Sequence, residues 1–180
     1  MIKLSFRSIL SVLFGLFILA GCDSNNDEDD AEDLLGSFEI EITGDVSQSL
    51  DGNQASFGVV TDPQTGITGF GMTLGATGTA ANGLSFSRKS GRPGNGNHSI
   101  ATFDLDTEIE TLSDDTFVAI YSTGTDVFYS SGGTLSVTSS SDRRIEGTIS
   151  MTARSILPTS TAEVTITGTF VAIGLDLSAQ

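Results

Sequence analysis

The sequence predicts an all-β protein, an antiparallel meander of about ten strands that closes as a barrel or packs as a two-sheet sandwich. From residue 34 onward the chain is rich in Gly, Ser and Thr with scattered Phe, Val and Ile, and it lacks runs of helical period. Apolar and polar residues alternate instead with period two, between short groups of turn-forming residues. Short connections favour antiparallel neighbours, because parallel strands need long crossovers.

The first expected strand shows the pattern in its simplest form. Phe38, Ile40 and Ile42 share one face, and Glu39 and Glu41 take the other. Such a segment buries one face and leaves the other in water.

The later expected strands share this alternation and are separated by turn residues. They lie at 55–59, 70–74, 84–86, 98–103, 117–121, 127–129, 135–137, 145–153 and 164–172. The segment 117–121 (FVAIY) is apolar on both faces, which predicts a central strand. Strands with one apolar face each must close or stack to bury it, and the pattern is equally compatible with a barrel and a sandwich.

The amino terminus has the organisation of a signal peptide over residues 1–21. Lys3 and Arg7 precede an uncharged, mostly apolar run at 9–20, which is short for a bilayer-spanning helix. The run ends in Leu19-Ala20-Gly21-Cys22, and this stretch resembles the lipobox of bacterial lipoproteins.

The lipobox resemblance implies that Cys22 carries a diacylglyceryl thioether and becomes the acylated first residue after cleavage. Two or three acyl chains bind a bilayer stably, whereas one binds marginally. We therefore expect a lipid-anchored protein whose partner is the bilayer itself. The alternative is an ordinary secretory signal with an incidental Cys.

An acidic run follows the cysteine and reads as a disordered tether over residues 22–33. Seven acids fall within 23–33 (DSNNDEDDAED). Acids after a lipidated Cys resemble the surface-export signals of Bacteroidota-type lipoproteins, which implies the outer membrane and the cell surface. Asp23 directly after Cys22 resembles instead the inner-membrane retention signal of enterobacteria, which implies the periplasmic face of the inner membrane.

Composition excludes several function classes. With 8 Lys+Arg against 23 Asp+Glu the net charge is −15, so the chain repels nucleic-acid phosphates. One Cys forms no internal disulfide, and one Cys with one His supplies no zinc site of the usual kind. A histidine-dependent nucleophile would have to use His98, which is more typical of a strand-end residue.

A row of carboxylates is the candidate cation site. Asp104, Asp106, Glu108 and Glu110 alternate with other residues, so a strand would place them on one face. Ca²⁺ takes such oxygen ligands, but the spacing is not that of an EF-hand. A solvated acidic edge that prevents aggregation is the alternative, and an acid/base pair for glycoside hydrolysis is a further one. We expect no cofactor other than this candidate Ca²⁺.

A basic, glycine-rich loop is the candidate anion site. Arg88, Lys89 and Arg92 lead into Pro93-Gly94-Asn95-Gly96. Arginine in a Gly-rich loop can hold an anion, although the strand-loop-helix setting of nucleotide sites is missing. A hairpin loop whose bases offset the acidic domain is the alternative. Arg143-Arg144 is a second, smaller basic turn.

The carboxy-terminal strands resemble those of a group of uncharacterised all-β bacterial lipoproteins. The similarity lies in Arg144-Ile145-Glu146-Gly147-Thr148 and in the Thr-rich strand at 164–170. It implies fold and location, and no activity.

Three functions follow as hypotheses for the single domain at 34–180. The first is a surface-anchored, non-enzymatic binding or structural β-domain. The second is a barrel that holds a small apolar ligand, lipocalin-like in architecture. The third is a hydrolase that uses the acidic residues.

Overall fold

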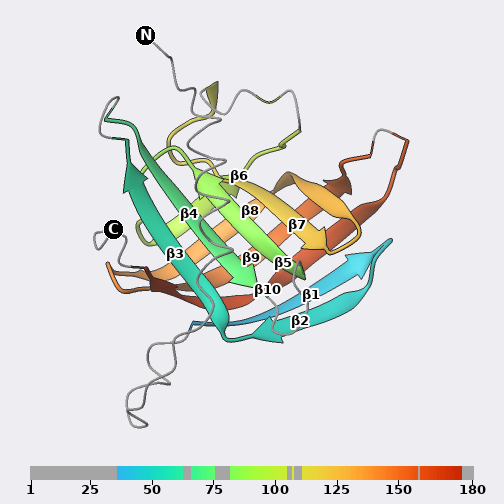
Figure 1. Ribbon diagram of the computed structural model, residues 1–180, viewed down its shortest axis with the longest axis horizontal. Helices are drawn as coiled ribbons and strands as arrows, with labels where there is room; N and C mark the ends of the chain where they lie inside the picture. The colour runs from blue at the N-terminus through green and yellow to red at the C-terminus, as the bar shows by residue number, and fades with distance from the viewer. Residues whose placement is uncertain are drawn as a thin grey trace.

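The computed structural model describes residues 36–62, 66–75, 82–104, 107, 111–157 and 159–175. These residues form ten β-strands and no α-helix (Figure 1). The strands are β1 (Ser37–Gly44), β2 (Gln48–Gly52), β3 (Gln54–Thr61), β4 (Thr68–Gly75), β5 (Asn82–Arg88), β6 (Gly96–Ile100), β7 (Val118–Thr123), β8 (Val127–Ser140), β9 (Arg144–Ser155) and β10 (Glu163–Gly174).

Seven strands close into a barrel, which decides between the two predicted architectures. The ring runs β3-β4-β5-β7-β8-β9-β10, and each neighbouring pair is antiparallel except the last. Closure comes from a short parallel contact in which Ile173 and Gly174 of β10 lie beside Ser56 and Phe57 of β3. Strands β3, β4, β5 and β7 form the near wall in Figure 1, and β8, β9 and β10 the far wall.

The β1–β2 hairpin is added to the barrel at one edge of β10. That edge pairs with β1 from Val164 to Val171 and only then reaches β3. Gly36 lies at the point where the two pairings meet, against the carbonyl oxygens of Ala55 and Val171. A side chain at this position would collide with both carbonyls, so the crossing requires glycine.

Strand β6 is added in the same way to one edge of β8, which pairs first with β7 and then with β6. Ser130 lies between the two pairings and is buried. Its hydroxyl accepts a hydrogen bond from the Ala119 amide at 3.1 Å and donates one to the Ala101 carbonyl at 2.8 Å. One side chain thus replaces the ladder bonds that are lost at the branch.

The interior of the barrel is filled by one continuous cluster of apolar side chains. Aromatic rings form its centre: Phe57 stacks on Phe70 at 5.8 Å, and Phe117 packs edge-on against Phe70 and Phe86 at 5.9 and 6.4 Å. Tyr121 stacks on Phe128 at 5.7 Å. Burying each such ring contributes roughly 1.5–3 kcal/mol, so these rings dominate the stability of the fold.

Most predicted strands are confirmed, and the differences have local causes. The segment at 117–121 is a central strand, since β7 pairs on both sides and both Val118 and Ala119 are buried. Two expected strands, 127–129 and 135–137, are parts of the single strand β8, which continues through Gly132 and Gly133. The expected strand at 98–103 is β6, which ends at Ile100.

The alternation also did not predict β2, for which no strand was expected. This strand has only Leu50 as an apolar residue, so it shows no alternation. The chain is moreover not a pure meander, because β6 pairs with β8 and β10 pairs with both β1 and β3.

Candidate functional site

Arg88, the last residue of β5, is a charged side chain buried at one end of the barrel. Only 6 % of it is exposed. Its Nε donates to the Gly91 carbonyl at 2.8 Å and its Nη2 donates to the Ser90 hydroxyl at 3.2 Å. The guanidinium carbon lies 5.4 Å from the centre of the Phe117 ring, in range of a cation–π interaction.

The third nitrogen of Arg88 is less well satisfied. Nη1 is buried and has no hydrogen-bond partner among the described residues. Within the described part of the chain it forms an ion pair with the Asp115 carboxylate at 3.7 Å, which is too long for a hydrogen bond. Burial lowers the pKa of Arg88 below its ordinary value, and the Asp115 and Asp114 carboxylates act in the opposite direction.

The other two cations of the predicted anion site also have acidic neighbours. Lys89 lies 3.5 Å from Asp114, and Arg92 lies 2.9 Å from Asp142. Arg92 donates a further hydrogen bond to the Ser140 hydroxyl at 2.7 Å. The structure therefore gathers Arg88, Lys89 and Arg92 at one end of the barrel and places an aspartate beside each.

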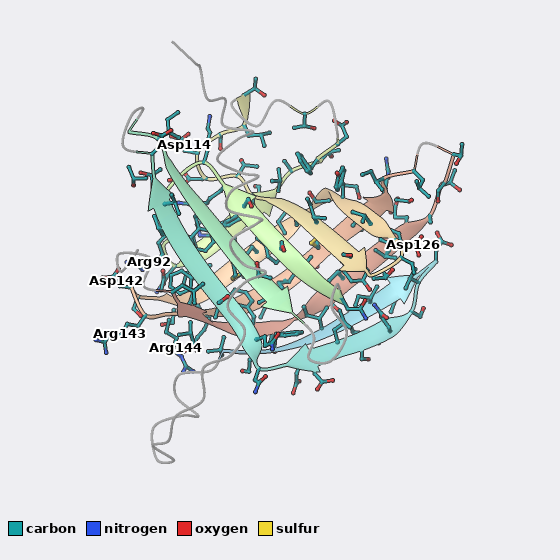
Figure 2. The ribbon with its side chains drawn as sticks, viewed as in Figure 1. Arg92, Asp114, Asp126, Asp142, Arg143 and Arg144 are labelled. Carbon is teal, nitrogen blue, oxygen red and sulfur yellow. The ribbon has the colours of Figure 1, made fainter. Side chains whose placement is uncertain are left out.

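The second basic turn lies at the same end. Figure 2 shows Arg92, Asp142, Arg143 and Arg144 close together on one side of the molecule, with Asp126 on the opposite side. The proximity follows from the pairing of β6 with the end of β8, which brings the 88–95 loop onto the β8–β9 hairpin. Arg144 pairs with Glu146 at 2.7 Å.

His98 lies on β6 beside this cluster and is half-buried. Its ring packs edge-on against Phe117 at 5.8 Å, and its Nε2 lies 2.8 Å from the Gly94 carbonyl oxygen. This contact identifies Nε2 as the protonated nitrogen, because a carbonyl only accepts hydrogen bonds. Both interactions fasten the glycine-rich loop to the barrel.

The predicted cation site falls mostly outside the described residues. Asp106, Glu108 and Glu110 lie there, and Asp104 alone of the row is described. The Asp104 carboxylate accepts a hydrogen bond from the Thr107 hydroxyl at 2.7 Å. Within the described part of the chain, no three His, Cys, Asp or Glu side chains lie close enough together to hold a metal.

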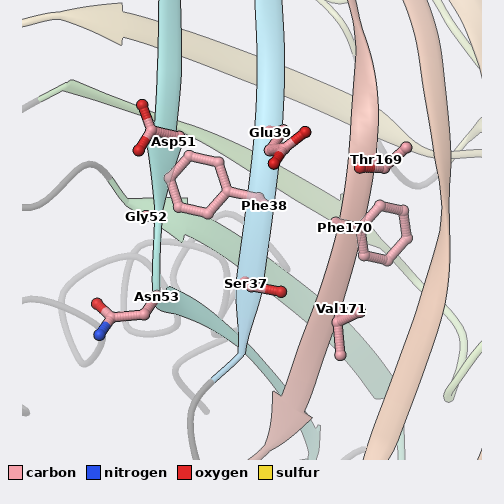
Figure 3. Close-up of a pocket in the computed structure, with 9 residues that line it drawn as sticks. All are labelled: Ser37, Phe38, Glu39, Asp51, Gly52, Asn53, Thr169, Phe170 and Val171. Atoms are coloured by element: carbon pink, nitrogen blue, oxygen red, sulfur yellow. The ribbon is translucent and has the colours of Figure 1, made fainter.

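A groove of about 600 Å³ lies along β2, β1 and β10, lined by exposed residues and by the core residues Phe38 and Phe170 (Figure 3). Its exposed rim includes Glu39 and Asp51, which are direct partners across β1 and β2. Like charges facing each other across a sheet destabilise it. The remaining lining residues are Ser37, Phe38, Gly52, Asn53, Thr169, Phe170 and Val171.

Sequence reasoning found the cations of the barrel end but missed their partners. Asp114, Asp115 and Phe117 reach Arg88 and Lys89 from a segment more than 20 positions away. The sequence offered one signal, a pair of adjacent acids, Asp114 and Asp115, that could complement the adjacent bases Arg88 and Lys89. That match carries no information on contact until the pairing of β5 with β7 is known.

The predicted lipidation site, Cys22, and the acidic run after it lie outside the described residues. In the described ranges, no helix combines the length and the apolar character that crossing a bilayer requires. Comparisons with protein-family models, with curated proteins and with solved structures each gave no match for this chain.

Proposed function

We propose that this protein is a bacterial lipoprotein, anchored through Cys22, whose β-barrel binds or displays a partner at its outer surface and performs no catalysis. The observation that carries the binding or structural role is the filled barrel. The described core side chains lie in its interior, which favours contact with a partner through the outer faces and the ends.

The anchor rests on the sequence. Leu19-Ala20-Gly21-Cys22 supports lipidation, and the acids at 23–33 support a tether that keeps the domain away from the headgroups. The length of that acidic run favours the outer membrane and the cell surface over retention at the inner membrane.

A chamber for an apolar ligand is the competing proposal, and the packing weighs against it. Ligand sites of this kind typically have volumes of about 300–1,000 Å³ lined by apolar side chains. The lining of the described groove instead includes the Glu39 and Asp51 carboxylates, which do not suit an apolar ligand. Hydrolysis by the acidic row remains a proposal that depends on Asp104 and its neighbours in sequence.

Lipidation is tested by the Cys22→Ala variant. Because Cys22 is the only cysteine, the thioether has one site in the chain. We expect loss of labelled palmitate and accumulation of uncleaved precursor, while the neighbouring variant Ser24→Ala incorporates palmitate normally. Unchanged labelling of Cys22→Ala would refute the anchor. Protease digestion of intact cells then distinguishes a surface location from a periplasmic one.

A further inference from the structure

Arg88 has an unmet donor at a position where the protein could hold a ligand. Its Nη1 is buried without a hydrogen bond to any residue that the structure describes, and the carboxylate of Asp115 lies beyond hydrogen-bond distance at 3.7 Å. A buried charged donor that lacks an acceptor is costly, so a better acceptor at this nitrogen would be favoured.

The guanidinium is held in place for such an acceptor. The Gly91 carbonyl and the Ser90 hydroxyl fix two of its nitrogens, and the Phe117 ring supports its face. Lys89 is the next residue and adds a second positive charge. Its side chain is 22 % exposed. Arginine and lysine both suit phosphate-type oxyanions, arginine through its paired donors and lysine through its compact charge.

The two aspartates are loosely attached competitors. Asp115 and Asp114 sit on the turn from Ser113 to Thr116, and their side chains are 86 % and 76 % exposed. Because both carboxylates lie mostly in solvent, water solvates them when they rotate away from the cations. Rotation of the two side chains removes these carboxylates from Arg88 and Lys89 without breaking a strand pairing, because both aspartates lie between β6 and β7.

We propose that Arg88 and Lys89 form a binding site for a phosphate-type oxyanion, which the chain's own Asp114 and Asp115 occupy as displaceable internal ligands. This inference rests on the proposed binding role of the domain and names the chemistry of its ligand. It does not depend on the anchor, so failure of lipid labelling and failure of anion binding are separate results.

The test is titration of the full-length protein with inorganic phosphate at constant ionic strength, followed by calorimetry. Asp115→Asn removes the competitor at Arg88, and we expect it to bind phosphate about tenfold more tightly than the unaltered protein. That change is equivalent to about 1.4 kcal/mol. The matched control is Glu163→Gln, which removes the carboxylate of the Arg154 pair at 3.0 Å and should leave phosphate affinity unchanged.

A second variant separates a site from a general charge effect. Adding Lys89→Gln to Asp115→Asn should abolish the gain, because the ammonium is part of the site. Equal phosphate affinities for Asp115→Asn and Glu163→Gln would overturn the proposal, as would a gain that survives Lys89→Gln. Parallel titrations with glycerol phosphate and with phosphatidylglycerol vesicles identify the source of the phosphate, and either response supports the site.

Discussion

Single polar side chains hold the branch points of this sheet, and Ser130 is the clearest case. It links β7, β8 and the segment after β6 through one hydroxyl. Removing that hydroxyl takes away the hydrogen bond that it makes to the Ala119 amide and the one that it makes to the Ala101 carbonyl. The cost of such a loss exceeds the value of an average hydrogen bond.

We therefore expect Ser130→Ala to lower the free energy of unfolding by about 1–3 kcal/mol. Urea denaturation measures the difference, and Ser139→Ala on the exposed part of the same strand is the control. Equal midpoints for the two variants would mean that the branch is held by the backbone alone.

Tyr121 makes stability depend on alkaline pH. Burial raises its pKa above the ordinary value near 10, and the hydrogen bond that Gln48 donates to its hydroxyl acts in the opposite direction. The unfolded chain then loses its proton first, so stability is intact below about pH 10 and falls as pH rises above it.

Tyr121→Phe should flatten this fall, at a cost of about 1 kcal/mol at neutral pH for the lost hydrogen bond. Denaturation at pH 7 to 11 measures both effects. Burial also raises the pKa of Tyr129, the other tyrosine, so Tyr129→Phe should flatten the fall as well, and the double variant should flatten it most. An unchanged slope in Tyr121→Phe would contradict the assignment.

At the scale of the strands, glycine allows close approach where β10 meets β1. A Cβ at Gly168 would collide with the Glu39 carbonyl of the neighbouring strand. We expect Gly168→Ala to destabilise the protein by about 1–3 kcal/mol, because the collision is with backbone and cannot relax cheaply.

The matched change is Gly94→Ala, where a Cβ meets open space. Its effect should stay within about 0.5 kcal/mol, and thermal melts of both variants measure the contrast. Similar losses in the two variants would show that the β1–β10 contact tolerates displacement.

The sequence predicted strands wherever alternation was strong, as at Phe38, Ile40 and Ile42. The prediction was wrong where residues typical of turns lie inside a strand. Gly132 and Gly133 resemble a turn, yet they continue β8 with φ values of +148° and +150°, which glycine adopts readily. Barrel closure at Ile173 depends on a register between distant strands, and no local pattern encodes it.

For the whole molecule, net charge opposes folding. Residues 34–180 carry 16 acids and six bases, a charge of −10. In the described part of the chain there are five ion pairs, each with an exposed acidic partner, and they offset little of this repulsion. Salt at 1 M shortens the range of charge interactions to about 3 Å.

We expect the 34–180 domain to melt at a higher temperature in 1 M NaCl than in 10 mM NaCl. Thermal melts at the two concentrations decide this, and a flat or falling midpoint would show that net charge does not limit the fold. A rise specific to Ca²⁺ over Mg²⁺ at equal ionic strength would support the acidic row at 104–110 as a cation site.

The pairing of β10 with both β1 and β3 also sets the order in which the barrel can assemble. Strands β1 and β3 each need β10, at 163–174, as a partner. The β1–β2 and β3–β4 pairings need only short connections. The ribosome synthesises β10 after the other nine strands. Until then the hairpins can form, but the barrel cannot close.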